Sequence, residues 1–382
     1  MHNKYFEAID KLYNEYVGFW QDVCNIESPT EYKTGVDAVG NYFAEWARKN
    51  GWSVEIFEQD KAGNVVTITM NLQSNEKPIC FSGHIDTVHP IGSFGTPAVR
   101  TDDQKIYGPG VTDCKGGLVA AALAMDALSK CGYEKRPVML ILQSDEENGS
   151  KMSNKATVNY ICERAKDVVA FLNLEGHTVG KACTERKGIV TFCFNVKGIA
   201  AHSSRCAVEG ASAIREAAYK IIELEKFKDN DGLTCNCGLI KGGTAVNSVP
   251  DECEFYANVR YATQEQYDSI CEQVKKLANT SFVEGCTCTV EISSQRLAME
   301  YSERNMELLS NINTALKNAG LQGLEPSKRT GGSDAADVTA FGIPCIDSIG
   351  VTGGNIHSIN EFAQLDSLRQ SAKRLVAIAE YI

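Results

Sequence analysis

The 382-residue sequence lacks three features: a long apolar run, the apolar core of a signal peptide, and an excess of positive charge. Its first residues are polar and lead into an amphipathic pattern, and no run of about 18 apolar residues follows. We therefore expect a cytoplasmic protein that is neither exported nor inserted in a membrane. Lys and Arg number 38 against 49 Asp and Glu, a formal net charge of −11. This balance argues against nucleic acid or an anionic membrane surface as the main partner.

Internal repeats and low-complexity linkers are also lacking. Hydrophobic residues make up 43% of the chain and charged residues 23%, as is typical of a soluble globular protein. Because 382 residues exceed what one hydrophobic core usually supports, the length predicts two domains.

Cysteine, in contrast, is abundant, with 15 residues. In a chain that we expect in the cytosol, reduced thiols are the simplest interpretation. Two Cys-x-Cys pairs, Cys235/Cys237 and Cys286/Cys288, invite a metal interpretation. We favour core packing, because alternation along a strand puts both thiols of a pair on one face. A thiolate metal site is the less favoured alternative, since four-cysteine zinc sites usually contain Cys-x₂-Cys.

Strand and helix patterns alternate through the first half of the chain. Apolar residues recur at helical spacing over 6–23, and residues 116–130 form an alanine- and leucine-rich helix pattern. A further helix is expected near 153–165. Strands are expected at 54–57, 65–70, 78–82, 138–143 and 168–174. This alternation predicts an α/β fold, an αβα catalytic domain with a largely parallel central sheet.

The rhythm changes after residue 187. Strands are expected at 188–196, 234–240, 252–261 and 287–293, with helices at 210–227 and 263–278. The order β-α-β-β-α-β is the ferredoxin-like arrangement. After a helix at 303–318, the chain returns to α/β character through 343–349. We therefore expect a catalytic domain over 1–186 and 297–382, interrupted by an inserted lid domain over 187–296.

Five acidic and imidazole side chains follow expected strands or lie in glycine-rich loops. In parallel α/β sheets such positions meet at the carboxyl edge, where ligands bind. Singly, each motif has an ordinary interpretation as a solvated loop, a surface pair or a turn. Together, two imidazoles and three carboxylates suit a pair of divalent cations, Zn²⁺ first, with Co²⁺ or Mn²⁺ as alternatives. The predicted ligands are His84, Asp113, Glu147, Glu175 and His357.

The chemistry of a metal pair suggests a role for each side chain. Asp113 is the natural bridge, with one oxygen for each ion. His84 and Glu175 would hold one ion, and Glu147 and His357 the other. Asp86 is expected to accept the second N–H of His84. Glu146 is expected to act as the general base toward the attacking water.

With these residues assembled, the chain resembles the dinuclear zinc peptidase and deacylase family over nearly its whole length. That family includes carboxypeptidase G (glutamate carboxypeptidase), acetylornithine deacetylase, succinyl-diaminopimelate desuccinylase, aminoacylase and tripeptide aminopeptidase. The resemblance extends from the segment Val36–Asn41 to Asn360–Phe362. It implies the same five ligands, the base Glu146 and the orienting Asp86. It also implies a cis peptide after Asp113.

Further resemblance lies in the expected lid. The segment Lys197–Ser203 is similar to one whose histidine, here His202, reaches the neighbouring subunit's site and stabilises the oxyanion. Taken alone, His202 would be an ordinary loop histidine. Asn247 and Arg260 match substrate-contacting residues of the family. The resemblance thus implies a homodimer, with the lid domain also serving dimerisation.

Within the family, the glutamate carboxypeptidase branch is most similar. A substrate with a free carboxylate calls for arginine, although each arginine alone would be interpreted as a surface ion pair. We expect a metallocarboxypeptidase that cleaves the amide bond N-terminal to a free-carboxylate amino acid, with glutamate as a candidate, in small peptides or N-acyl amino acids. The predicted substrate-binding residues are Asn247, Arg260, Arg296, Arg329 and Gly332.

Three alternatives stay open. Glu175 stands where that branch often has Asp and where deacylases more often have Glu, so an N-acyl-amino-acid deacylase is a close rival. A di- or tripeptide aminopeptidase is less favoured, because no extra acidic anchor for a free amine stands out. A non-catalytic binding protein on the same fold is disfavoured because Glu146 accompanies all five ligands.

Overall fold

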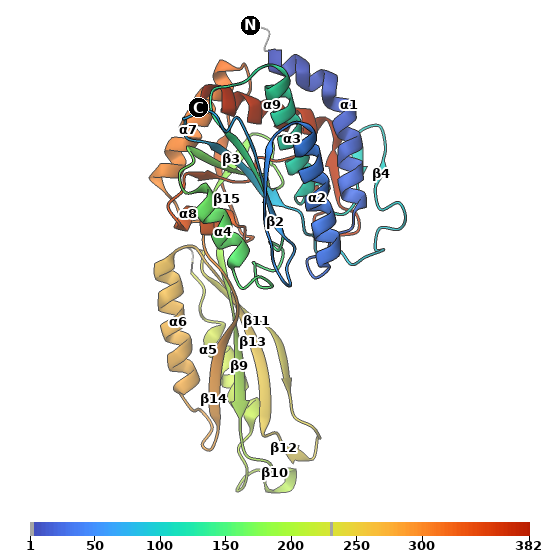
Figure 1. Cartoon of the computed structure of the whole chain (residues 1–382). Coiled ribbons are helices and arrows are strands. Elements are labelled where there is room, and N and C mark those ends of the chain that lie inside the picture. Colours follow the sequence, from blue (N-terminus) through green and yellow to red (C-terminus); the bar gives the residue numbers. More distant parts are fainter. Residues whose placement is uncertain (1–3, 230–231) are drawn as a thin grey trace. The chain divides into compact units, whose positions relative to one another are not determined.

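The computed structural model describes residues 4–229 and 232–382 (Figure 1). Residues 1–3 and 230–231 belong to the expected catalytic and lid domains and lie outside the described residues. The chain forms two compact units. The first comprises Met1–Thr184, Tyr301–Lys328 and Ser333–Ile382, and the second Glu185–Glu300 and Arg329–Gly332. Within the described ranges, no helix combines the length and apolarity needed to cross a lipid bilayer.

A six-stranded sheet forms the centre of the first unit, in the order β1-β2-β6-β3-β7-β16. The four strands from β6 to β16 are parallel, whereas β1 and β2 are antiparallel additions at one edge. This confirms the predicted α/β class with a largely parallel sheet. The strands are β1 (Ser53–Phe57), β2 (Val65–Met70), β3 (Ile79–His84), β6 (Val138–Gln143), β7 (Ala170–Asn173) and β16 (Cys345–Ile346).

Helices cover both faces of this sheet because its strands are apolar on both sides. Alternate residues such as Phe81 and Leu140 join one large core with α1, α2, α3, α7 and α9. The opposite face of β6 packs against α4, and α8 contacts α4 and β16. The helices are α1 (Lys4–Asn25), α2 (Lys33–Lys49), α3 (Lys115–Lys130), α4 (Ala156–Ala165), α7 (Glu303–Asn318), α8 (Ala335–Ala340) and α9 (Leu365–Tyr381).

Two small sheets complete the first unit's strand pairing. Four short strands pair in the order β17-β18-β5-β4 and bring the loop before α3 beside the segment after His357. β15 and β8 form a separate pair. Their bounds are β4 (Arg100–Thr101), β5 (Lys105–Tyr107), β8 (Lys181–Arg186), β15 (Glu325–Arg329), β17 (Gly353–Gly354) and β18 (Phe362–Gln364).

The second unit is an antiparallel sheet, ordered β11-β13-β9-β14, with α5 and α6 packed against it. Its chain order confirms the predicted β-α-β-β-α-β pattern. A short β10–β12 pair and the 3-10 turn η1 (Ser203–Arg205) were not predicted. The elements are β9 (Gly188–Lys197), β10 (Ala201–His202), α5 (Ala213–Leu224), β11 (Thr234–Gly242), β12 (Ser248–Val249), β13 (Glu252–Tyr261), α6 (Gln264–Asn279) and β14 (Thr287–Arg296).

The paired cysteines need one correction. Cys235 and Cys237 both lie on β11, as expected, but Cys286 precedes β14 and only Cys288 is on the strand. Among the described residues, neither pair belongs to a cluster of potential metal ligands. Cys235 and Cys286 are both buried, and Cys235 belongs to the apolar core of the second unit.

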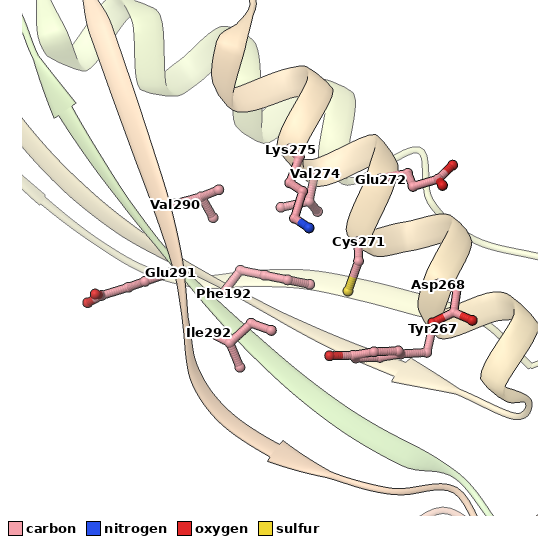
Figure 2. Close-up of a pocket in the computed structure, with 10 residues that line it drawn as sticks. All are labelled: Phe192, Tyr267, Asp268, Cys271, Glu272, Val274, Lys275, Val290, Glu291 and Ile292. Atoms are coloured by element: carbon pink, nitrogen blue, oxygen red, sulfur yellow. The ribbon is translucent and has the colours of Figure 1, made fainter.

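A cavity of about 500 Å³ lies in the second unit between α6 and β14 (Figure 2). Phe192, Val274, Val290 and Ile292 give it apolar walls, and Tyr267 and Cys271 project into it from α6. None of the predicted site residues lines this cavity. The candidate chemistry therefore lies elsewhere in the chain.

Candidate metal centre

The predicted ligands of the first unit converge because β6, β3 and β7 are parallel neighbours. Their carboxyl ends share one edge of the sheet, so residues that follow them meet there. His84 ends β3 and pairs in register with Gln143 at the end of β6. Glu147 follows β6, and Glu175 follows β7. The amide of Leu174, the residue between β7 and Glu175, donates to the Ser82 carbonyl.

Asp113 lies at the centre of this cluster, and its two carboxylate oxygens face different imidazoles. Oδ1 is 3.0 Å from Nε2 of His84, and Oδ2 is 3.2 Å from Nε2 of His357. Oε2 of Glu147 is 3.2 Å from the His357 nitrogen, and Oε1 of Glu175 is 3.7 Å from the His84 nitrogen. All five predicted ligands are therefore brought together, in two groups around Asp113.

Backbone geometry supports the placement of two of these side chains. The Asp113–Cys114 peptide is cis, as the resemblance implied. His357 has φ 61°, in the left-handed region that costs a non-glycine residue roughly 1–2 kcal/mol. Such a conformation often marks a functional loop.

The protonation equilibria reflect an excess of negative charge. Hydrogen bonds to Asp113 and Glu147 raise the pKa of His357 to about 10. Burial raises the pKa of the Glu147 carboxyl to about 7, although the hydrogen bond from His357 opposes the rise. Burial also disfavours ionisation of Asp113, but both imidazoles hold its pKa well below the usual range. Three carboxyl groups packed around two imidazoles thus attract positive charge, and divalent cations fit this donor set.

His84 directs Nε2 toward the other predicted ligands because its Nδ1 contacts Asp86. Nδ1 lies 2.9 Å from the backbone carbonyl of Asp86 and 3.3 Å from the Asp86 carboxylate. A carbonyl oxygen only accepts, so Nδ1 carries the proton. The expected contact with Asp86 is therefore present mainly through the backbone oxygen.

The Asp86 carboxylate has a further role that was not predicted. Its Oδ1 accepts the backbone N–H of Glu146 and its Oδ2 that of Glu147, each at 3.1 Å. Thr30 donates a third hydrogen bond at 2.8 Å. One buried carboxylate thus fixes the backbone that carries both glutamates. The spacing of Asp86 from His84 indicated only the imidazole contact, since backbone partners leave no pattern in the sequence.

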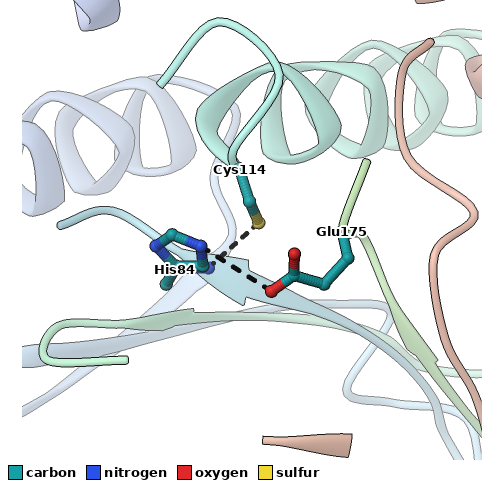
Figure 3. Close-up of side chains that lie close together, drawn as sticks. All are labelled: His84, Cys114 and Glu175. Carbon is teal, nitrogen blue, oxygen red and sulfur yellow. Dashed lines mark hydrogen bonds and ion pairs between the residues drawn. The ribbon is translucent and has the colours of Figure 1, made fainter. Parts of the chain in front are cut away.

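Figure 3 shows a further neighbour, Cys114, beside His84 and Glu175. These three residues form a second group whose potential ligand atoms lie within 4.8 Å of one another. The Cys114 sulfur accepts the His84 backbone N–H at 3.2 Å, and burial raises the pKa of its thiol. We interpret the thiol as a neutral neighbour that supports the His84 backbone.

The remaining predicted residues belong to the second unit and form two groups. His202 on β10 pairs with Ser248 on β12, and Asn247 accepts the Ser203 amide at 3.0 Å. His202 is exposed. Nδ1 of His202 accepts the Ser204 backbone N–H at 3.3 Å, so in a neutral ring Nε2 carries the proton. That nitrogen is then a donor.

The arginines form the other group. Arg260 on β13 and Arg296 on β14 both stand opposite Ile189 on β9, so their side chains share one face of the sheet. Arg260 donates to the Thr330 carbonyl at 3.2 Å. A Cβ on Gly332 would lie 2.4 Å from Cδ of Arg296, so the segment 329–332 packs closely on this face. Arg329, in the same segment, accepts the Lys187 amide through its backbone carbonyl.

The chain is similar to known peptidases and deacylases over most of its length. A family model described as peptidase family M20/M25/M40 matches residues 80–381. Carboxypeptidase G2 of Pseudomonas sp. (strain RS-16) is 28% identical over 346 residues, covering 88% of this chain and 82% of that protein. Succinyl-diaminopimelate desuccinylase of Rickettsia rickettsii (strain Sheila Smith) is 23% identical over 382 residues, covering 93% and 96%. Among solved structures, aminopeptidase PepT from Bacillus cereus superimposes with a TM-score of 0.80 at 22% identity, covering 96% and 98%.

Proposed function

The chain belongs to peptidase family M20/M25/M40, and on this basis we propose that it is a two-metal hydrolase of carboxypeptidase type. Family membership makes it a metallo-hydrolase of peptidase or deacylase type. The finer proposal is that it cleaves the amide bond N-terminal to an amino acid with a free carboxylate, with glutamate as a candidate. Substrates would be small peptides or N-acyl amino acids.

One observation carries the proposal: each oxygen of Asp113 faces a different imidazole, at 3.0 and 3.2 Å. In our assignment Asp113 would be shared by two ions, of which His84 and Glu175 would hold one and Glu147 and His357 the other. Zn²⁺ suits these donors, with Co²⁺ or Mn²⁺ as alternatives. When bound, such ions supply the Lewis acidity that lowers the pKa of a water molecule and polarises the substrate carbonyl.

Glu146 is the proposed general base. The Asp86 carboxylate accepts the backbone N–H of Glu146 at 3.1 Å. Glu146 is buried and precedes Glu147 in the chain. Its carboxylate takes a proton from the attacking water and delivers it to the leaving amine nitrogen. Asp86 positions both His84 and the two glutamates, so its loss would disturb ligand and base together.

His202 is proposed to stabilise the oxyanion. In the neutral ring Nε2 carries the proton and can donate a hydrogen bond, because Nδ1 accepts the Ser204 N–H. A donor directed at the carbonyl oxygen where charge develops lowers the barrier. The nearby Asn247 would contact the same part of the substrate.

Arg260, Arg296 and Arg329 are proposed to bind the substrate carboxylate, with Gly332 admitting it to their face of the sheet. Burial lowers the pKa of Arg260, but a guanidinium remains charged at neutral pH. Planar guanidinium groups bind a carboxylate through paired hydrogen bonds. Arg260 and Arg296 lie on neighbouring positions of one face, which supports a shared ligand.

The spacing within the second unit supports a homodimer. Ile189, between the two arginines, lies at the start of β9, and His202 follows the other end of this 10-residue strand. At 3.3 Å per residue, β9 alone spans about 30 Å. Figure 1 shows β10 and β12 at one end of this sheet. One small substrate cannot touch both groups of one chain, so we propose that His202 and Asn247 act on a substrate held by a second copy.

A substrate panel on the zinc- and cobalt-loaded enzyme tests the function. It compares N-acyl-Glu, N-acyl-Ala, acetyl-ornithine, dipeptides and tripeptides, each beside its C-terminally amidated counterpart. The proposal expects amidation to abolish turnover, and Arg260→Ala to raise KM for the free-carboxylate substrates. Equal turnover of free and amidated substrates would contradict the arginine assignment.

A deacylase remains the second candidate, favoured by Glu175 and by the desuccinylase relative. Faster hydrolysis of acetyl- or succinyl-amino acids than of every peptide in the panel would select it. An aminopeptidase, in contrast, would require a free α-amine and turn over amidated di- and tripeptides.

A further inference from the structure

Glu361 is a buried carboxylate next to the candidate metal centre, with 1% of its surface exposed. Oε1 accepts the backbone N–H groups of Thr112 at 2.9 Å and Asp113 at 3.1 Å. Oε2 accepts the Gly110 N–H at 3.3 Å and faces Nε2 of His89 at 2.9 Å. Both oxygens of one side chain are thus engaged by four donors.

These donors come from the loops that carry the candidate ligands. His89 follows His84 by five residues, and the three backbone amides precede or belong to Asp113. Glu361 itself follows His357 by four residues. Two more contacts join the same loops, from the Gly108 amide to the Glu361 carbonyl at 3.3 Å and from the Thr112 hydroxyl to the Phe362 carbonyl at 2.7 Å. One carboxylate therefore ties three segments into a single unit.

The charge and shape of a carboxylate suit this position better than any neutral isostere. An ionised carboxylate offers about four acceptor sites and no donor. A glutamine has one acceptor oxygen, and its NH₂ group would face N–H donors that belong to the backbone. Charge-assisted hydrogen bonds to backbone N–H groups are also stronger than neutral ones.

We propose that Glu361, oriented by His89, is a positioning residue that sets the ion affinity of the centre by fixing the Asp113 backbone relative to His84 and His357. The proposal rests on the two-metal function proposed above. A change in this carboxylate would move or loosen the bridging Asp113 without removing any ligand. Mutation of residues that hydrogen-bond to metal ligands typically lowers metal affinity by about 10- to 100-fold.

Glu361→Gln is the direct test, with Glu216→Gln as the matched control. Glu216 is also buried, 1% exposed, and its Oε2 accepts two backbone N–H groups, at 2.9 and 2.7 Å, but it belongs to the second unit. Each variant is titrated with Zn²⁺ and Co²⁺ against a chelator of known affinity. The visible absorption of the cobalt form reports ligand geometry independently of turnover, and thermal unfolding is followed for metal-free and loaded protein.

We expect Glu361→Gln to lower ion affinity by about 10- to 100-fold and to alter the cobalt spectrum. Glu216→Gln should lower the unfolding temperature and leave the ion affinity and the cobalt spectrum unchanged. Wild-type affinity and spectrum in a folded Glu361→Gln protein would overturn the proposal, even if the unfolding temperature falls.

His89 gives a second, milder test should Glu361→Gln not fold. His89→Gln keeps a side-chain donor and should bind ions nearly as the wild type does, whereas His89→Leu should lose affinity. Equal affinity of the two variants would contradict the positioning role. A wild-type chain that binds no ions would instead contradict the two-metal function itself, so the two failures are distinguishable.

Discussion

Gly117 offers the sharpest prediction, because it lies between two ligand-bearing segments. A Cβ at this position, in the first turn of α3, would lie 2.2 Å from the backbone carbonyl oxygen of Leu174. Since a carbonyl cannot turn aside as a flexible side chain does, α3 and the Glu175 segment must separate by about 1 Å in Gly117→Ala. Asp113, just before α3, and Glu175 would then move apart.

The magnitude follows from two opposing terms. Glycine to alanine inside a helix stabilises by up to about 1 kcal/mol. Overpacking of a filled space costs about 1–3 kcal/mol. We therefore expect Gly117→Ala to lower the free energy of unfolding by about 1–2 kcal/mol. A displacement of about 1 Å at the site is expected to lower kcat/KM roughly 100-fold.

Gly18 supplies the matched control. It lies within α1, and nothing comes within 4 Å of a Cβ added there. Gly18→Ala should therefore stabilise the protein by about 0.5–1 kcal/mol with unchanged activity. Urea unfolding and kcat/KM are measured for both variants. If Gly117→Ala is as stable and active as Gly18→Ala, the close approach of α3 to the Glu175 segment is refuted.

Three further predictions follow from the same structure. Glu146→Gln should reduce kcat by about 10²–10⁴-fold while ion content by elemental analysis stays at the wild-type value, and full activity would remove Glu146 from the mechanism. Lys220→Met should destabilise by about 3–5 kcal/mol in urea unfolding, because it leaves the buried Glu216 carboxylate without the ammonium that lies 3.0 Å from it. A cost below about 1 kcal/mol would contradict a structural role for the pair. The raised pKa values of His357, about 10, and Glu147, about 7, favour protons on the folded metal-free chain, so its stability should fall as pH rises from about 4.5, the ordinary glutamate value, to about 10. The metal-loaded protein should lose much less stability over this pH range. Thermal unfolding that shows the same pH dependence for metal-free and metal-loaded protein would contradict the prediction.

The sequence predicted the convergence of the ligands because they follow strands with clear apolar runs. β3, β6 and β7 begin and end within two residues of the expected bounds. Once these strands are parallel neighbours, His84, Glu147 and Glu175 must meet at one edge. The antiparallel attachment of β2 to β6 was not predicted, because a β-rich run carries no mark of its direction.

The supporting contacts could not be predicted in the same way. Glu361 accepts amides from residues about 250 positions away in the chain, and Asp86 accepts amides about 60 positions away. Backbone N–H groups are common to nearly all residues, so such contacts leave no composition or spacing to find. What marks these two carboxylates is their burial, and burial comes from the fold.

Residue placement also explains what the sequence left open about the substrate. The candidate oxyanion donor and the candidate arginine clamp lie near opposite ends of β9, and residue spacing alone, without the family resemblance, does not reveal which copy of the chain each one serves. The role proposed for His202 therefore requires dimer formation, whereas the role proposed for Asp113 requires the first unit alone.

Ion stoichiometry of the reconstituted chain is the most direct test of the central claim. We expect about two divalent ions per wild-type chain by elemental analysis after removal of excess metal, with amide hydrolysis lost on chelation and restored by Zn²⁺ or Co²⁺. Asp113→Asn, which changes the residue shared by both groups, should bind far less metal. Far fewer than two ions on the wild-type chain, or unchanged stoichiometry in Asp113→Asn, would contradict a bridged two-metal centre.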